Sequence, residues 1–466
     1  MSNIGHSAAR LAASKAFDVV LKNVDKNREK EVCKLIDLME KYMSDEKMDV
    51  NYDRAREMVN NKDGALNKYI NRVLDEVDPK VLKTMALNLG FESFLYGTKT
   101  IRKMRVKYDC NVPWLILMDP TSACNLHCTG CWAAEYGNKL NLTFEEMDNV
   151  VKQGKELGVY FYMFTGGEPL VRKADLIRLC EKHNDCAFLS FTNGTLVDQA
   201  FCDELKRIGN LYLAISLEGF SEVNNLRRGN GVFGKVMNAM DLLKQNGLVF
   251  GTSICYTSKN CEAVTSEEFV DLMIEKGCRY AMYFHYMPVG NDASLELLPS
   301  PEQRTYIKDR IREIRNMTTG KGIFTMDFQN DGEFVGGCIA GGRNYFHINA
   351  NGDAEPCVFI HYSGANIRTH SLLEILKQPL FMAYHDNQPF NENHLRPCPM
   401  LENPEILQKM VRETGAKSTD LQSPESAEHL CKKCEEYARK WKPCAEKLWE
   451  ETEVKPKAYS NYKDHK

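Results

Sequence analysis

The stretch PWLILMDPTSACNLHCTGC, residues 113–131, decides how the chain folds and where its chemistry lies. Its first half contains the apolar run WLILM, which is typical of a buried β-strand. Its second half places Cys124, Cys128 and Cys131 within eight residues, in the pattern C-x3-C-x2-C. Three thiols directly after a strand indicate a metal-ligand set that leaves one position open.

Short β-rich runs alternate with helical stretches from about residue 113 to 325. The runs are PWLILMDP, YFYMFTGG, AFLSFTNG, LYLAISLEG, VFGTSICYT and YAMYFHYMPVG. Helical patterns between them, such as TFEEMDNVVKQGKELG, end in glycine, as helices often do. Six strand–helix units predict a parallel sheet with right-handed crossovers. A full eight-unit barrel takes about 250 residues, so we predict an α/β fold with a partial (β/α)6 TIM-type barrel.

The segments on either side of this barrel lack the alternation. Residues 1–112 carry apolar residues at three- and four-residue spacing and predict a helical N-terminal region. Near its end, TKTIRKMRVKY holds five basic residues, which suit either a solvated edge or contact with an anionic substrate or membrane surface. Residues 326–466 hold six of the 17 cysteines and predict a small cysteine-rich C-terminal domain.

Composition narrows the class of protein. The 466 residues are 43% hydrophobic and 27% charged, as in a globular chain of two or three domains. A net charge of −4 argues against a nucleic-acid surface, and no apolar run reaches the roughly 18 residues of a membrane span. We find no secretion signal, so we expect a cytoplasmic protein with reduced thiols. Cys180, Cys202 and Cys255 fall in apolar or amphipathic segments, where we expect plain core residues.

The cysteine loop suits more than one kind of metal site. Active sites of parallel barrels lie at the carboxyl ends of the strands, where this loop begins. A four-iron cluster with three cysteine ligands keeps one iron free for a substrate or cofactor. A structural zinc site normally closes with a fourth ligand, and His127 lies awkwardly close to Cys124 and Cys128 for that role. The spacing favours the cluster, with zinc and unligated thiols as the alternatives.

The next three strands end in groups that suit one polar ligand. Two glycines in FTGGEP let a backbone approach closely, and a carbonyl and a glutamate there accept from an ammonium group. FTNG offers a hydroxyl and an amide for a ribose or carboxylate. Beyond SLEG, Arg227 and Arg228 are able to grip a carboxylate bidentately. The order of these groups at successive strand ends indicates one shared site.

These motifs and their order resemble the radical S-adenosylmethionine (radical SAM) enzymes over roughly residues 113–325. The resemblance implies that Cys124, Cys128 and Cys131 hold a [4Fe–4S] cluster whose open iron chelates the amino and carboxylate groups of SAM. Reductive cleavage of SAM would then give a 5′-deoxyadenosyl radical that abstracts hydrogen from an unactivated C–H bond. The cofactors carry this chemistry, while the barrel positions them and excludes water and oxygen.

The resemblance also implies which residues contact SAM. They are Gly166, Gly167 and Glu168 for the methionyl ammonium, Thr192 and Asn193 near the ribose, Ser216 and Glu218 at the SxDG-like strand end, and Arg228 for the methionyl carboxylate. Glu218 departs from the usual aspartate but keeps its charge. Gly130 stands where an aromatic residue often lies against the adenine, so either Trp132 substitutes or the pocket is built differently.

The C-terminal cysteines resemble the opening of the SPASM extension, a region that carries auxiliary iron–sulfur clusters. NYFHINANGDAEPC predicts a strand–turn–strand hairpin that delivers thiolates. The resemblance implies one auxiliary cluster held by Cys338, Cys357 and Cys398, with the fourth ligand open. The remaining thiols, Cys431, Cys434 and Cys444, lie in a charged helical pattern and suit either ligands, a zinc clip or surface thiols. Two histidines, His285 and His361, suit either site contacts or ordinary packing.

We therefore expect a radical enzyme that abstracts hydrogen from a peptide or protein substrate. The helical N-terminal region shows no winged-helix pattern of a leader-peptide binding module, so remodelling of a lipid or isoprenoid chain remains an alternative. A non-radical iron–sulfur carrier or scaffold is the alternative from another class. The expected partners are an electron donor such as ferredoxin or flavodoxin, and the substrate, with peripheral membrane contact left open.

Overall fold

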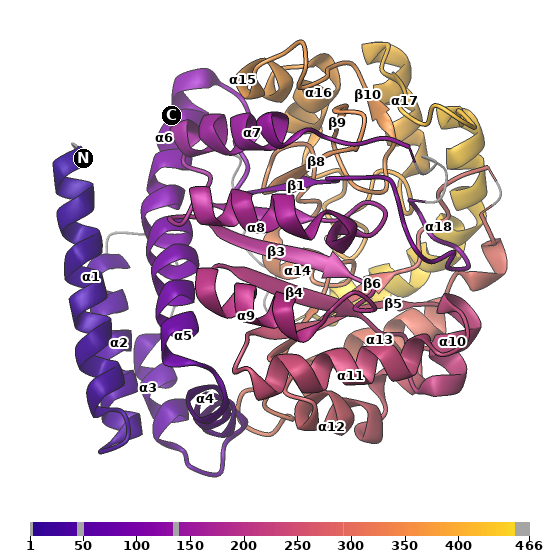
Figure 1. Cartoon of the computed structure of the whole chain (residues 1–466). Helices are drawn as coiled ribbons and strands as arrows, with labels where there is room; N and C mark the ends of the chain where they lie inside the picture. The colour runs from indigo at the N-terminus through magenta and orange to yellow at the C-terminus, as the bar shows by residue number, and fades with distance from the viewer. Residues whose placement is uncertain (1–2, 44–50, 134–138, 292, 453–466) are drawn as a thin grey trace.

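The structure is a computed structural model that describes residues 3–43, 51–133, 139–291 and 293–452. The N-terminal region is helical, as predicted, and its helices lie along one side of the molecule (Figure 1). They are α1 (Asn3–Asn23), α2 (Arg28–Met43), α3 (Tyr52–Asn60), α4 (Ala65–Glu76), α5 (Pro79–Met85), the π-helical segment η1 (Ala86–Gly97) and α6 (Thr98–Tyr108).

The basic stretch near the end of this region forms α6. Arg105 donates to the Val112 carbonyl from two of its nitrogens, at 2.8 and 3.0 Å, and Lys107 lies over the Tyr108 ring. Arg105 also donates to the carbonyl of Arg343 in the C-terminal part of the chain. Arg105 therefore serves internal packing, which neither predicted role includes, while Arg102, Lys103 and Lys107 are exposed, as a solvated edge requires.

A single sheet forms the centre of the molecule. Among the described residues nine strands pair in the order β7-β6-β5-β4-β3-β2-β1-β8-β9. Every pair from β7 to β8 is parallel, and β8 and β9 are antiparallel. The strands are β1 (Leu115–Met118), β2 (Phe161–Phe164), β3 (Ala187–Thr192), β4 (Leu211–Ser216), β5 (Phe250–Tyr256), β6 (Tyr280–His285), β7 (Phe324–Asp327), β8 (Tyr345–Ile348) and β9 (Ala354–Glu355).

Helices between the strands cover the outer face of this sheet (Figure 1). They are α7 (Phe144–Leu157), α8 (Lys173–Lys182), α9 (Gln199–Ile208), α10 (Ser221–Arg228), α11 (Val232–Gln245), α12 (Glu267–Glu275) and α13 (Pro301–Ile314). Local sequence explains their bounds: Thr143 and Glu146 form a capping box before α7, and Gly158 ends it at φ +96°. The predicted α/β partial barrel is confirmed.

The C-terminal region contributes β8 and β9 to the central sheet, so the sheet crosses the predicted domain boundary at 325. That boundary falls inside β7, and β8 pairs with β1 from Leu115 beside Tyr345 to Met118 beside Ile348. The predicted hairpin is confirmed as β8 and β9. The other elements are α14 (Gly332–Val335), β10 (Tyr362–Ser363), α15 (Leu372–Leu376), α16 (Pro379–Asn387), α17 (Pro404–Thr414), β11 (Lys417–Ser418) and α18 (Ala427–Glu450).

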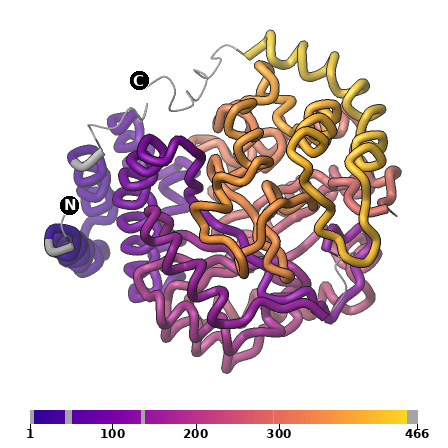
Figure 2. The backbone as a smooth tube through the Cα atoms, turned by 90° about the horizontal axis from the view of Figure 1, so that it is seen from above, coloured from indigo at the N-terminus to yellow at the C-terminus, as the bar shows by residue number. Residues whose placement is uncertain are grey.

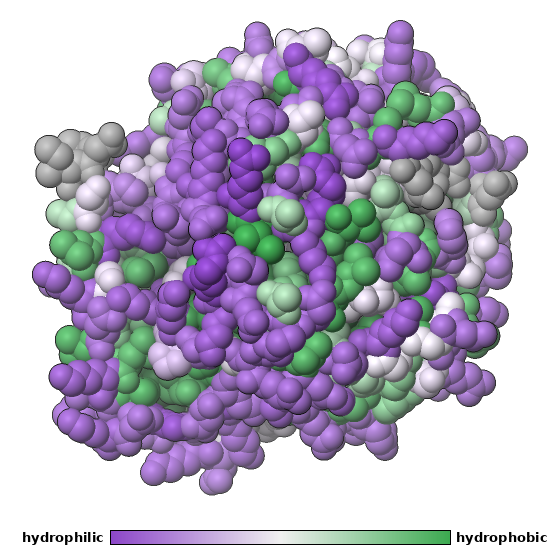
Figure 3. Space-filling view, viewed as in Figure 1, coloured by the Kyte–Doolittle hydropathy of each residue, from purple (hydrophilic) through white to green (hydrophobic). Residues whose placement is uncertain are grey.

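Two apolar cores hold these layers together. One lies between the sheet and its helices, and the other joins the inner face of the sheet to the C-terminal region. The N-terminal helices and α18 lie on opposite sides of the barrel (Figure 2). Hydrophilic side chains cover most of the face in Figure 3, with hydrophobic ones in small groups between them. In the described part of the chain, helices that combine the length and the apolar character needed to cross a bilayer are absent.

Candidate functional site

The cysteine loop follows β1 and is bound to the end of β2. Gly167 N–H donates to the Thr121 carbonyl at 3.0 Å, and Glu168 N–H donates to the Ala123 carbonyl at 2.7 Å. A Cβ atom on Gly167 would lie 2.2 Å from the Ala123 oxygen. The sequence predicted that these glycines admit a ligand, and the structure shows that they admit the cysteine loop itself.

The three thiols of the loop are half-buried and free of disulfides. Leu126 N–H donates to Cys124 Sγ at 3.4 Å, and Arg228 Nη1 lies 3.9 Å from Cys128 Sγ. Burial nevertheless raises the pKa of Cys124 to about 11 and raises that of Cys128, so the thiolates need a further cation to form. His127, the doubtful fourth ligand, is exposed.

Glu168 connects two strand ends rather than facing solvent. Its buried carboxylate accepts from Leu170 N–H at 3.0 Å, Thr192 Oγ1 at 2.7 Å and Asn193 N–H at 2.7 Å. Burial raises its pKa despite these bonds. The Asn193 amide in turn donates to Asn125 Oδ1 in the cysteine loop at 2.8 Å. These residues lie together, and contacts within the chain fix the position of the Glu168 carboxylate.

Glu218 gathers both arginines of the SLEG segment beside the cysteine loop. Its carboxylate accepts from Arg227 Nη1 at 2.8 Å and from Arg228 through Nε and through Nη2, the latter at 2.6 Å. Arg227 Nε also donates to the Thr129 carbonyl at 3.2 Å. Burial opposes ionisation of Glu218, but Arg228 and Arg227 outweigh it and lower the pKa of the carboxyl. One carboxylate and two guanidiniums leave net positive charge next to Cys128.

Strand register shows which side chains line the inside of the barrel. Leu117 lies beside Met163 in β2 and beside His347 in β8. Because alternate residues of a strand face the same side, this inner face continues through β3 to β6. Its half-exposed members toward the carboxyl ends of the strands are Met163, Phe191, Ser216, Ser253, Cys255 and Phe284. Solvent therefore reaches the inner face near the cysteine loop.

Cys255 is a residue of this face that sequence reasoning assigned to the core. Burial raises the pKa of its thiol, while the charge of Arg227 lowers it, which shows how close the thiol lies to the site. Cys180 and Cys202 are fully buried, as predicted. The period-two pattern of VFGTSICYT, which sets Ser253 and Cys255 on one face, was the signal for this placement.

The ring of Tyr286, the residue after β6, lies beside Gly130, which precedes the third cysteine. Gly130 has φ +66°, and a Cβ on it would lie 2.8 Å from Cε2 of Tyr286, the residue after β6. Trp132 instead packs edge-on against His347, Phe359 and His361 in the C-terminal region, with ring centroids 5.8–6.3 Å away. Of the two predicted alternatives, the structure favours the differently built pocket, with the Tyr286 ring at this place.

The predicted auxiliary cysteines come together between the barrel and α16. Burial raises the pKa of the Cys398 thiol, and the negative charges of Glu402, Cys338 and Cys357 raise it further. Met400 N–H and Leu401 N–H donate to Cys398 Sγ, both at 3.4 Å. For the other two thiols, a backbone hydrogen bond from the residue two positions further lowers a pKa that burial has raised: Ala340 for Cys338 and Phe359 for Cys357.

The thiols of α18 lie beside this group. Cys431 and Cys434 are buried in the same apolar core as Cys357, and Cys444 is half-buried there. In the described ranges, three Cys, His, Asp or Glu side chains do not converge on one point as the ligands of a single ion would. An iron–sulfur cluster places its own iron and sulfide atoms between the thiolates, so it does not need such convergence.

Both histidines of doubtful role are packed inside the protein. His285 Nε2 and the Tyr437 hydroxyl of α18 are 2.8 Å apart, and burial lowers the pKa of His285 to about 3. His361 Nε2 lies 3.1 Å from the Val358 carbonyl and its ring meets Trp132. For both residues the structure bears out the ordinary packing role.

Comparisons with known proteins agree with this arrangement. A model of the Radical SAM superfamily matches residues 118–260, and a model of SPASM, an iron–sulfur cluster-binding domain, matches residues 338–400. Fe-coproporphyrin III synthase of Methanosarcina barkeri is 26% identical over 233 residues, which are 47% of this chain and 57% of that protein. PqqA peptide cyclase of Granulibacter bethesdensis is 28% identical over 259 residues, 53% of this chain and 67% of that protein.

A solved structure shows the same fold. SuiB of Streptococcus suis, bound to its precursor peptide SuiA, superposes with a TM-score of 0.50 at 18% identity, covering 60% of this chain and 69% of that chain. The first curated relative is matched over only 57% of its length. With the cysteine loop after β1, the barrel and the C-terminal thiols all in place, the chain contains a radical SAM domain and, after its barrel, a SPASM domain.

Proposed function

We propose that this protein is a radical SAM enzyme that abstracts hydrogen from an unactivated C–H bond of a peptide or protein substrate. The observation that carries the proposal is the meeting of the cysteine loop with three strand ends and Arg228 at one end of the barrel. The radical SAM domain implies a [4Fe–4S] cluster and SAM as cofactors.

The residues at the loop fit a cluster. The Leu126 N–H on Cys124 and the Arg228 guanidinium beside Cys128 stabilise negative sulfur, which is what a thiolate ligand requires. Cys124, Cys128 and Cys131 would hold the cluster. When bound, the cluster and SAM supply a carbon-centred radical.

The chain's own groups bind and orient around that chemistry. Nη1 of Arg228 is the guanidinium nitrogen that Glu218 does not bind, and it faces the cysteine loop, where a carboxylate of SAM would accept from it. Thr192 and Asn193 are held by Glu168, so their strand end keeps its place beside the loop. The Tyr286 ring, in front of Gly130, would lie against the adenine.

The proposed substrate class rests on relatives and on the inner face. A relative named PqqA peptide cyclase and a neighbour solved with a precursor peptide support a peptide. The inner face offers Met163, Phe191 and Phe284 for apolar contact and Ser253 for a hydrogen bond, a mixture that suits a peptide side chain. Fe-coproporphyrin III synthase as another relative makes a tetrapyrrole the second candidate.

Cofactor assembly and cleavage test the proposal. The protein is reconstituted anaerobically and given SAM with dithionite or with a ferredoxin- or flavodoxin-type donor, and 5′-deoxyadenosine is measured. We expect 5′-deoxyadenosine from the wild type, and about four fewer irons per chain in Cys128→Ala. Cys33→Ala, a half-exposed thiol of α2, is the matched control and should keep its iron. A fully loaded wild type that forms no 5′-deoxyadenosine would instead support a non-radical carrier or scaffold.

The substrate class is tested in the same assay. A peptide fraction and an iron coproporphyrin are added separately, and the yield of 5′-deoxyadenosine is compared with the substrate-free yield. Stimulation by the peptide fraction, with deuterium carried from a deuterated peptide into 5′-deoxyadenosine, supports the proposal. Stimulation by the porphyrin alone would replace the peptide by the second candidate.

A further inference from the structure

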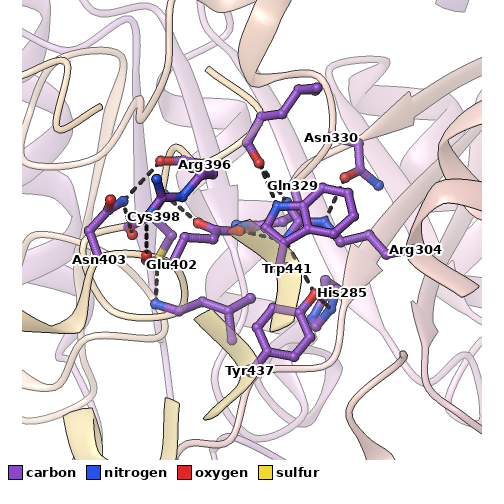
Figure 4. Close-up of polar contacts among 12 residues, drawn as sticks. His285, Arg304, Gln329, Asn330, Arg396, Cys398, Glu402, Asn403, Tyr437 and Trp441 are labelled. Carbon is purple, nitrogen blue, oxygen red and sulfur yellow. Dashed lines mark hydrogen bonds and ion pairs between the residues drawn. The ribbon is translucent and has the colours of Figure 1, made fainter. Parts of the chain in front are cut away.

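A buried network connects the barrel to the C-terminal region (Figure 4). At its centre Arg304 of α13 and Glu402 form an ion pair of 2.7 Å, and both side chains are 0% exposed. Arg304 also donates to Asn330 Oδ1 at 2.8 Å and lies 4.1 Å from the ring centroid of Trp441 in α18. A fully buried arginine costs desolvation energy that the pair offsets only through complete hydrogen bonding, so the pair itself is weak support for a role in stability.

Glu402 connects Arg304 to Cys398, one of the predicted auxiliary cysteines. Its Oε1 accepts from Arg304 and from Gln329 Nε2 at 2.6 Å, while its Oε2 accepts from Cys398 N–H at 2.7 Å. The segment that starts at Cys398 then folds back, and Met400 N–H and Leu401 N–H both point at Cys398 Sγ. Glu402 therefore fixes the backbone that presents this sulfur.

The same arginine docks α18, the helix that carries three further thiols. Tyr437 accepts from Arg304 Nη1 at 3.2 Å, and Trp441 stacks on the guanidinium. Cys434 precedes Tyr437 by three residues and Trp441 by seven, so the three share one face of α18. The buried residues of α18 follow this face. Arg304 thus holds this face of α18 against the barrel. The same face carries Cys434 toward the predicted auxiliary cysteines.

The pair also places two opposite charges close to the thiols. Glu402 Oε2 lies 2.7 Å from the backbone nitrogen of Cys398, so its negative charge lies close to the sulfur that this residue presents. Inside a protein such charges are weakly screened, and charges near an iron–sulfur cluster are among the factors that set its reduction potential. Arg304 and Glu402 act on that potential in opposite directions.

We propose that Arg304 and Glu402 are a positioning pair for the auxiliary site: Glu402 presents Cys398, Arg304 docks α18, and their opposed charges set the reduction potential of the cluster held there. The inference rests on the proposed auxiliary cluster at Cys338, Cys357 and Cys398. It assigns a task to two residues that lie outside the cysteine motif.

The test isolates the auxiliary cluster in a variant with Cys124, Cys128 and Cys131 all changed to alanine. Iron per chain and the midpoint potential from an EPR-monitored titration are measured in this background. Glu402→Gln should raise the potential because a negative charge is lost. Arg304→Gln should lower it because the Glu402 charge is left uncompensated. Arg310→Gln, a half-buried and ion-paired arginine of the same helix, is the control and should leave the potential unchanged.

The outcomes separate this inference from the proposed function. If no iron remains in the triple variant, the proposed auxiliary site itself fails. If about four irons remain and the two variants shift the potential in the same direction, or not at all, the positioning pair is wrong. Should Arg304→Gln not fold, Glu402→Asp decides: it keeps the charge, so its potential should stay near the wild type, and a shift as large as that of Glu402→Gln overturns the inference.

Discussion

Gly130 shows how a single missing side chain reshapes the cysteine loop. Its positive φ and its contact with the Tyr286 ring both require glycine. In the radical SAM enzymes that the sequence resembles, an aromatic side chain often stands at this position. In this chain the aromatic ring is that of Tyr286, the residue after β6. The Tyr286 ring therefore keeps its position beside the cysteine loop only because Gly130 has no Cβ atom.

Substitution Gly130→Ala should be costly for two additive reasons. The left-handed backbone costs about 1–2 kcal/mol with a Cβ, and crowding against Tyr286 costs about 1–3 kcal/mol more. Gly415→Ala is the matched control, because Gly415 has φ +68° but open space around it. Thermal midpoints of both variants measure the difference. Equal losses in the two variants would show that the Tyr286 contact contributes nothing.

For single residues, the sequence predicted which ones belong to the site better than it predicted which groups they bind. The loop cysteines and the GGEP glycines were found because each group follows a strand, and Arg228 was found through the resemblance to radical SAM enzymes. That Glu218 binds both arginines was not predictable, because the spacing of residues along a chain does not say which donors turn toward a buried carboxylate. The contact of Tyr286 with Gly130 was not predictable for the same reason, because it spans more than 150 positions of sequence.

His347 joins three elements of the sheet. It lies in β8 with Nε2 2.8 Å from Asp119 Oδ1, just after β1, and Nδ1 2.7 Å from Glu355 Oε2 in β9. Burial alone would lower its pKa, but the two carboxylates outweigh burial and raise the pKa to about 10. A protonated histidine between two buried carboxylates holds the seam between the barrel and the SPASM domain.

This ion triad makes stability depend on pH. The folded pKa of His347 lies above its unfolded value of about 6.5, so its contribution is complete below that pH and is lost as pH rises through about 10. The thermal midpoint of His347→Gln should therefore fall far below the wild type at pH 6, and the gap should narrow toward pH 10. The exposed His370→Gln is the control. A gap that stays constant with pH would show that His347 is neutral in the folded protein.

Strands and helices were predictable where their period is strong and their pairing is local. The six β-rich runs all became strands, and the NG-containing hairpin formed as β8 and β9. The parallel pairing of β8 with β1 was missed. Its partners lie some 230 residues apart along the chain, and an apolar four-residue run carries no signal of which distant strand it joins.

The whole molecule connects its two cysteine sites through one set of contacts. From Cys398 the path runs through Glu402 and Arg304 to Tyr437, and from there to His285. His285 directly precedes Tyr286, whose ring meets the cysteine loop at Gly130. The barrel and the SPASM domain thus share both a sheet and a buried polar network. The predicted three-part division therefore describes changes of sequence pattern rather than separately packed domains.

The pairing of β8 with β1 also determines whether the barrel is able to exist alone. A fragment of residues 1–337 lacks β8 and leaves Leu115–Met118 as an unprotected sheet edge made of apolar residues. Exposed edges of this kind recruit strands from other molecules. We expect the fragment to aggregate in light scattering, and Leu117→Lys to reduce the aggregation by placing a charge on the edge. A soluble monomeric fragment would contradict this. By supplying β8, the SPASM domain then protects the edge strand β1 against pairing with other molecules. This role is independent of any cluster that the domain holds.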